Sequence, residues 1–216
     1  MKKIASPLFQ DLSEAELDTL AAAGHLRTRQ FAKHEVIFRA GSCVREIGIV
    51  LRGSVHIENL DLWGTKSILS SVGAGQAFAE TYAFCGEALM VDAVAAEHCE
   101  ILFLHTAALT DARLEPALKD KLLRRLLAVS MRKNLSLSQR IFCTTPKTVR
   151  GRLLTYFSAQ AARCGRMAFE VPFNRQQMAD YLNLDRSALS KELCKMRDEG
   201  LLEFDKNRFV LKQLPE

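Results

Sequence analysis

The sequence predicts an α+β protein, with an all-β first part, a long helix and a small mixed C-terminal domain. Three patterns predict this class: short runs rich in β-branched and aromatic residues from 26 to 104, leucines spaced by three and four residues from 114 to 141, and mixed helix and strand signals beyond. The 216 residues, 48% hydrophobic and 25% charged, suffice to bury a core and exclude a disordered chain, a collagen or a coiled-coil rod.

Residues 1–112 are expected to form a jelly-roll-like β-roll that follows one short helix. Ser13 as N-cap and Glu16 three positions later predict the helix over 13–22, before Gly24 ends it. Glycines then separate short apolar runs at a spacing typical of a barrel or jelly roll. The predicted strands are 46–51, 54–59, 66–72, 90–95 and 100–104.

Residues 113–143 predict a long amphipathic helix. At 1.5 Å per residue it would extend about 40 Å, which is more than a small β-barrel covers. We therefore expect its apolar stripe to pair with a second copy and form a homodimer, while packing within one chain is the alternative. The stripe comprises Leu114, Leu118, Leu122, Leu126, Val129 and Leu137, and the dimer interface is expected at Leu118, Leu122, Leu126 and Val129.

Residues 144–216 predict a winged helix-turn-helix, with a domain boundary near 143–146. Thr144-Thr145-Pro146 supplies an N-cap and a proline suited to the first position of a helix that runs to about residue 162. Helix, tight turn, helix and hairpin follow, which is the order typical of this fold. The expected elements are a strand at 167–171, helices at 175–182 (N-cap Asn174) and 187–198 (N-cap Asp185, closed by Gly200), and strands at 201–204 and 208–212.

The basic charge is concentrated in the C-terminal half. Residues 1–112 have a net charge of −5, residues 113–145 of +6 and residues 146–216 of +4, within a total of +5. A basic domain favours a polyanionic partner, because cationic side chains release the counterions that phosphates hold. We therefore expect double-stranded DNA as the partner of the C-terminal domain, with a merely solvated basic face as the alternative.

The second helix of the helix-turn-helix is expected to read bases. Its apolar side should pack against the first helix and leave the N-terminal end outward, where a recognition helix enters the major groove. The candidate base-reading residues are Arg186, Ser187, Ser190 and Lys191. Four further residues are candidates for phosphate contacts, which position a protein on DNA without specifying sequence. They are Arg175, Gln176, Lys206 and Arg208.

Motifs along nearly the whole chain resemble the Crp/Fnr family of bacterial transcription regulators. They are Ala40-Gly41, the segments 50–55 (Val-Leu-Arg-Gly-Ser-Val) and 75–80 (Gly-Gln-Ala-Phe-Ala-Glu), and the segment from Asn174 to Lys191. The resemblance implies a homodimer on a pseudo-palindromic operator, an effector in the β-roll that shifts the DNA-binding heads between two arrangements, and RNA polymerase as a further partner. It also implies that Arg186, Ser187 and Lys191 occupy base-reading positions.

The effector is not expected to be cAMP. In the cyclic-nucleotide-binding members of this family, a Gly-Glu pair holds the ribose and a following Arg-Ser pair holds the cyclic phosphate. Here Glu80 stands at the ribose position, but Ala79 replaces the glycine, and Met90 and Val91 replace the Arg-Ser pair. A buried phosphate would lose charge-assisted hydrogen bonds worth roughly 1.5–3 kcal/mol each. Glu80 then either binds another ligand or has a structural role.

An unknown small hydrophobic molecule is the expected effector, and no cofactor is assigned. It would bind an apolar pocket between the roll and the long helix, although these side chains are alternatively plain core. The first 42 residues lack the cysteine cluster of the iron–sulfur members of the family, and the histidines and cysteines show no spacing diagnostic of haem. The candidate pocket residues are Phe78, Glu80, Tyr82, Phe84, Leu89 and Met90.

Other classes of function have little support in the sequence. It has neither the His-x-His of a metal-dependent cupin nor Gly-x-Ser-x-Gly, so we expect neither a metal site nor an enzyme. The six cysteines form no CxxC pair, and no apolar run approaches the roughly 20 residues of a membrane span. We expect a cytoplasmic protein without membrane contact. A sensor that binds a protein partner instead of DNA is the alternative function.

Overall fold

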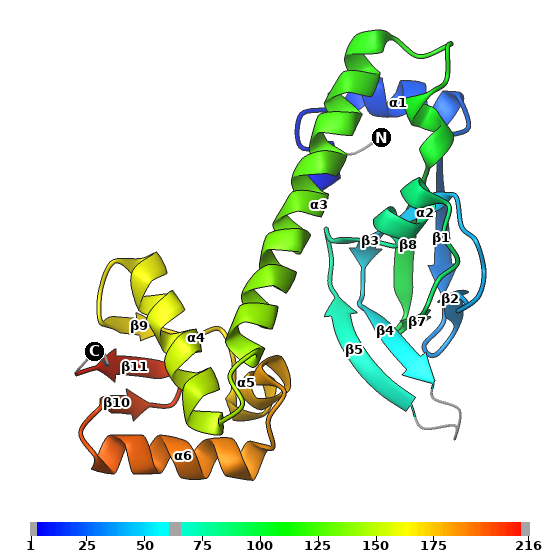
Figure 1. Cartoon of the computed structure of the whole chain (residues 1–216). Helices are drawn as coiled ribbons and strands as arrows, with labels where there is room; N and C mark the ends of the chain where they lie inside the picture. Colours follow the sequence, from blue (N-terminus) through cyan, green and yellow to red (C-terminus); the bar gives the residue numbers. More distant parts are fainter. Residues whose placement is uncertain (1–3, 61–65, 213–216) are drawn as a thin grey trace. The chain divides into compact units, whose positions relative to one another are not determined.

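The structure is a computed structural model that describes residues 4–60 and 66–212 (Figure 1). It contains helices and sheets, which confirms the α+β class. The chain divides into two units, Met1–Arg132 and Lys133–Glu216, and the long helix α3 (Pro116–Thr144) crosses the division between them. Each unit has a hydrophobic core of its own.

The first unit opens with η1 (Pro7–Phe9) and α1 (Glu14–Ala22). The predicted capping box of α1 is present: the Ser13 hydroxyl accepts a hydrogen bond from the Glu16 amide at 3.2 Å, and the Glu16 carboxylate accepts one from the Ser13 amide at 2.8 Å. Leu17 of the same helix is buried and joins the core of the first unit. The capping hydrogen bonds thus fix the start of this helix directly after Ser13, as predicted.

Two four-stranded antiparallel sheets form the predicted β-roll. One has the strand order β1-β8-β3-β6 and the other β2-β7-β4-β5. A short helix, η2 (Thr106–Leu109), leads from the roll to α3. The strands are β1 (Leu26–Phe31), β2 (Val36–Phe38), β3 (Glu46–Arg52), β4 (Val55–Leu60), β5 (Lys66–Val72), β6 (Ala77–Phe78), β7 (Asp92–Ala95) and β8 (Cys99–His105).

Aromatic rings pack the inside of the roll. The Phe103 ring lies 6.1 Å from that of Phe31 and 5.6 Å from that of Phe38, between centroids. Phe78 continues the cluster at 5.7 Å from Phe38. Gly48 admits the Phe78 ring, because a Cβ at this position would lie 2.2 Å from a ring carbon. The side chains of the protein therefore occupy the interior of the roll.

A helix that the sequence did not predict interrupts the strands of the roll. Helix α2 (Glu80–Cys85) lies between two residues with left-handed backbone, Ala79 (φ 63°) and Gly86 (φ 73°). Six residues are too few for a helical period to show, and the aromatic residues in this segment favour strands. The expectation of an all-β segment was wrong at this point, and the next strand starts at Asp92 instead of Met90.

The second unit is a winged helix-turn-helix, as predicted (Figure 1). The apolar residues of its two central helices share one core: Met178, Ala179, Leu182, Leu189, Leu193 and Met196 are buried in it, and Leu184 in the turn is half-buried against it. A three-stranded antiparallel sheet in the order β10-β11-β9 completes the unit. The elements after α3 are α4 (Val149–Cys164), β9 (Ala168–Glu170), α5 (Arg175–Leu182), α6 (Arg186–Asp198), β10 (Leu202–Asp205) and β11 (Arg208–Leu211).

Helix α4 begins three residues later than predicted. The Thr148 hydroxyl accepts a hydrogen bond from the Gly151 amide at 3.0 Å, so Thr148 is the N-cap. Pro146 lies in the bend before the helix, where its carbonyl oxygen accepts a hydrogen bond from Arg152 Nε at 2.8 Å. Proline suits a first helical position but does not impose one, and here a side-chain cap further along the chain decides the boundary.

Candidate nucleic-acid interface

The N-terminal end of α6 is held by its cap residue, Asp185. The Asp185 carboxylate accepts hydrogen bonds from the Ala188 amide at 2.9 Å and from the Ser187 hydroxyl. The helix starts at Arg186, one residue earlier than predicted. Arg186, Ser187 and Lys191 are exposed and Ser190 is half-buried, so the candidate base-reading residues reach the surface of this unit.

Three arginines hold the helix-turn-helix in place. Arg150 of α4 forms ion pairs with Glu192 at 2.6 Å and with Glu199 at 2.9 Å, and thereby fixes α6. Arg152 donates to the carbonyl oxygens of Leu182 at 3.1 Å and Asn183 at 2.7 Å, in the turn. Arg140 donates to the carbonyl oxygens at the end of α5. These roles were not predicted from the sequence, because nothing in the spacing of the arginines identifies acceptors that lie far away along the chain.

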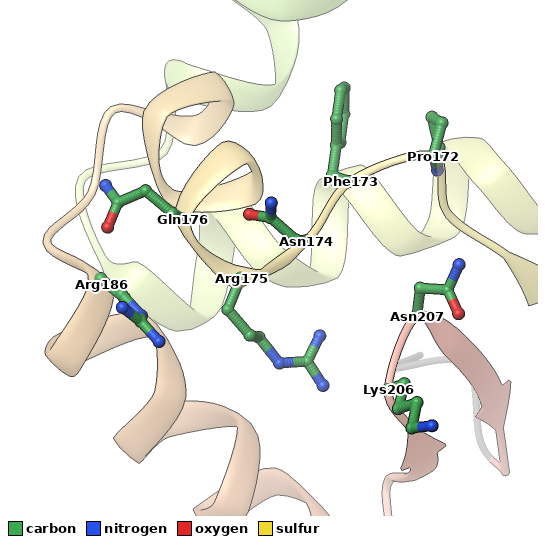
Figure 2. A pocket seen from close by; sticks show the side chains of 8 residues that line it. All are labelled: Pro172, Phe173, Asn174, Arg175, Gln176, Arg186, Lys206 and Asn207. Atoms are coloured by element: carbon green, nitrogen blue, oxygen red, sulfur yellow. The ribbon is translucent and has the colours of Figure 1, made fainter.

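A basic hollow of about 700 Å³ lies between α5, the start of α6 and the β10–β11 hairpin (Figure 2). Figure 2 shows the Arg175 side chain reaching into it from α5, with Arg186 beside it and Lys206 across from it on the hairpin. None of its lining residues is acidic. These residues are Pro172, Phe173, Asn174, Arg175, Gln176, Arg186, Lys206 and Asn207.

Arg175 is the half-buried cation of this hollow. Its guanidinium lies over the rings of Phe204, at 4.9 Å, and Phe209, at 5.1 Å from the centroids. Burial lowers the pKa of Arg175 from its ordinary value. Arginine still carries its charge at neutral pH, and the two rings of the hairpin fix its position. Arg175 therefore presents an oriented positive charge to the hollow.

The structure groups three of the four candidate phosphate contacts. Arg175, Gln176 and Lys206 line the basic hollow together with Arg186. Arg208 instead lines a separate depression of about 300 Å³, where Glu203 and Asp205 are also present. Arg208 lies at the start of β11, and its neighbours there make the local charge mixed.

We expect the Asp185→Asn variant to be less sensitive to acid than the wild type. Hydrogen bonds from the Ser187 hydroxyl and the Ala188 amide lower the pKa of Asp185 below its ordinary value. A lowered pKa in the folded state adds stability above the unfolded pKa, which is lost as the pH falls through the folded value. Asparagine caps helices about as well but does not titrate. Urea unfolding at pH 7 and pH 3 should show a smaller drop in the variant, and an equal drop would contradict the role of this carboxylate.

The candidate effector residues are scattered in the first unit. Phe78 is buried in the ring cluster of the roll. Leu89 is also buried but does not belong to that cluster, and Tyr82 is half-buried. Met90 is 77% exposed. Glu80 and Phe84 alone of the candidates line a hollow between α2 and α3, with a volume of about 230 Å³.

The leucines proposed for the dimer interface mostly face the core of their own unit. Leu118, Leu122 and Leu126 are buried there, at most 6% exposed, while Val129 is half-buried. Their burial leaves little side chain for a second copy to contact. A different set of apolar residues on α3 is about half exposed or more. This set, the exposed stripe of α3, comprises Leu123, Leu127, Met131, Leu135, Leu137, Ile141 and Phe142.

Comparison with known families and structures agrees with this architecture. The profile of the cyclic nucleotide-binding domain matches residues 28–114, and that of the Crp-like helix-turn-helix domain matches residues 151–216. The catabolite activator protein of Thermus thermophilus is 25% identical, over 96% of this chain and 94% of that one, with a TM-score of 0.50. CprK complexed with OCPA is 13% identical over 91% and 92% of the two chains, with a TM-score of 0.67, which shows the likeness of fold. No curated protein sequence matches the chain.

A roll with the profile of a cyclic nucleotide-binding domain, a long helix and a Crp-like helix-turn-helix domain together define the architecture of a Crp-like transcription regulator. The protein has this architecture in full. It belongs to the Crp/Fnr family of transcription regulators. Over the described part of the chain, no helix combines the length and the apolar character needed to cross a bilayer.

Proposed function

We propose that the protein is a homodimer that binds a pseudo-palindromic DNA operator through α6, works with RNA polymerase in the cytoplasm, and is controlled by an effector bound in the first unit. Arg186, Ser187, Ser190 and Lys191 would contact base edges in the major groove. Arg175, Gln176 and Lys206 would contact phosphates on one side of that groove. Two copies joined along α3 would present two such helices to successive turns of the duplex.

The observation that carries this proposal is the basic hollow. Arg175, Arg186 and Lys206 come from three different elements, and no acidic residue lines the space among them. A surface built in this way attracts the phosphates of a polyanion and repels basic proteins. Arg186 at the start of α6 joins the hollow to the exposed end of the recognition helix. Phosphate contact and base contact would thus occur next to each other.

A salt titration separates DNA from a protein partner. Binding to genomic fragments, and then to a labelled palindrome selected from them, should weaken steeply as salt rises, because each phosphate contact releases counterions. Binding that is absent from all fragments, or independent of salt, would contradict the proposal and favour a protein partner for the second unit.

Lys206→Ala is expected to weaken binding to all sequences alike and to reduce the salt slope by about one unit. Lys206 is exposed at the tip of the hairpin, where it lines the basic hollow. Lys212→Ala is the matched control, since Lys212 follows the opposite end of β11 and pairs with Glu203. The control should leave the slope nearly unchanged. A changed base preference in Lys206→Ala would contradict the assignment as a phosphate contact.

The effector proposed here is not a cyclic nucleotide. Met90 and Val91 stand where related cyclic-nucleotide-binding sequences have an arginine and a serine, and Met90 points its side chain to solvent at 77% exposure. The rings of Phe31, Phe78 and Phe103 occupy the interior of the roll. Calorimetry with cAMP should therefore detect no binding, and a dissociation constant in the micromolar range would contradict this part of the proposal.

A further inference from the structure

A cluster of three charged residues joins the start of α4 to two points on α6. Arg150 Nε donates to the Glu192 carboxylate at 2.6 Å, and both terminal nitrogens of Arg150 contact the Glu199 carboxylate at 2.9 Å. Glu192 and Glu199 are seven residues apart, which is about two helical turns, so they lie on the same side of α6. One guanidinium thus holds the recognition helix at two points along its length. We call Arg150, Glu192 and Glu199 the Arg150 cluster.

Two charges of the Arg150 cluster stand at the unfavourable ends of their own helices. Arg150 is the second residue of α4, near the positive end of the helix dipole, and Glu199 is the C-cap of α6, at the negative end. Each charge therefore weakens its own helix. The hydrogen bond from Arg150 lowers the pKa of Glu199 below its ordinary value, so the carboxylate is charged at neutral pH. The contact between the two helices, and not local helix stability, accounts for these charges.

Apolar packing and the Arg150 cluster constrain α6 in different ways. Leu153 of α4 and Leu189 and Leu193 of α6 are buried in one core, which holds the two helices together. Apolar contacts are non-directional, whereas a planar guanidinium bonds its acceptors only at particular positions and angles. The Arg150 cluster therefore determines how α6 is inclined against α4.

A small change in this inclination would displace the base-reading end of α6. Arg186 lies six residues before Glu192, or about 9 Å along the helix axis. A tilt of about 10° around the cluster would move the start of the helix by about 1.5 Å, while a binding site has to be held within roughly 0.5 Å. Base contacts made by Arg186 therefore depend on the Arg150 cluster.

We propose that Arg150 is a positioning residue for sequence recognition, which orients α6 in the major groove without contacting DNA itself. The inference rests on the proposed function, because it concerns the same recognition helix. Two carboxylates pair with one guanidinium, so the cluster has a net charge of −1 and does not attract phosphates. Arg150 differs in this respect from Arg175 and Lys206, which line the basic hollow.

Two variants that break the cluster change its charge in opposite directions. Arg150→Met removes the cation, while Glu192→Gln/Glu199→Gln neutralises both carboxylates and keeps the cation. Affinities for the selected palindrome and for a scrambled duplex of equal length, at fixed salt, give a specificity ratio. Both variants should lower this ratio by about tenfold or more, because base contacts at the start of α6 are lost. Ratios that stay unchanged, or that move in opposite directions, would overturn the proposal.

Two further variants separate positioning from a general effect on folding. Arg150→Lys should recover at least about threefold of the ratio lost in Arg150→Met, since an ammonium group still pairs with the carboxylates. Arg163→Met makes the same substitution at an exposed arginine in the last turn of α4 and should leave the ratio unchanged. No recovery with lysine, or an equal loss in Arg163→Met, would contradict the positioning role. Urea unfolding checks that each variant is folded, and the glutamine variant decides the question if Arg150→Met is not.

The salt dependence distinguishes this inference from the proposed function. On the scrambled duplex, Arg150→Met should keep the wild-type salt slope, whereas a slope smaller by about one unit would make Arg150 a phosphate contact and overturn the inference. If the wild type prefers the palindrome and both cluster variants keep that preference, the regulator stands and the positioning role is wrong. If the wild type itself prefers no sequence, the proposed function is wrong and this inference fails with it.

Discussion

Replacing both Leu123 and Leu127 by glutamate is expected to give a monomer and to weaken binding to a palindromic operator by about a hundredfold or more. Both leucines lie on the exposed stripe of α3, at 47% and 56% exposure, and neither belongs to the core of the unit. Two carboxylates in an apolar helix contact would be desolvated without partners. A monomer then engages one half-site without the high effective concentration that a joined second head provides.

Sedimentation measures the mass in this experiment, and a DNA titration at fixed salt measures affinity. Arg132→Glu is the matched control, because it changes the charge by the same amount at an exposed position on the opposite side of α3 from Leu123, nine residues further along. The control should stay dimeric. A dimeric Leu123→Glu/Leu127→Glu variant would show that the exposed stripe is not the interface.

Arg186→Ala is expected to cost about 1–3 kcal/mol of DNA-binding free energy, or about 5- to 150-fold in affinity, and to relax specificity at one base pair in each half-site. Arg186 is exposed at the first position of α6 and also lines the basic hollow. An arginine at the start of a recognition helix reaches guanine O6 and N7 with two parallel hydrogen bonds. Loss of the Arg186 side chain therefore removes a positive charge and also the hydrogen bonds that recognise the base.

Arg197→Ala controls for the loss of charge. Arg197 lies near the other end of α6, where it pairs with Asp198 and its guanidinium lies 5.5 Å from the centre of the Phe204 ring. Selection of operators from a randomised library should leave the preferred sequence of this control unchanged. If Arg186→Ala also kept the preferred operator sequence of the wild type, Arg186 would be a phosphate contact and not a base contact.

The sequence predicted elements best where local chemistry sets their limits. Ser13 with Glu16, and Asn174 with Gln177, form capping boxes that fix where α1 and α5 begin. Helix α2 was missed because its limits depend on the left-handed backbone at Ala79 and Gly86, which only the surrounding roll explains. The order of strands in the two sheets likewise depends on contacts between distant residues.

The candidate sites were predicted less completely than the fold. The spacing of Leu118, Leu122 and Leu126 correctly marks a buried stripe on α3, but the spacing does not say whether the same chain or another one covers it. The core of the same unit covers these leucines. Similarly, the positive charge of Arg175 was visible in the sequence, whereas its stacking on Phe204 and Phe209 required the hairpin to fold back onto α5.

The hydrogen bonds of Arg140 have a mechanical consequence. Arg140 lies in the last turns of α3 and donates to the carbonyl oxygens of Asp180 and Tyr181, both at 3.0 Å, while its guanidinium lies over the Tyr181 ring. The end of α3 is thereby clamped to the helix that precedes the turn. Any rotation of this end of α3 would therefore turn α5 with it, because the two hydrogen bonds tie these helices together within the second unit.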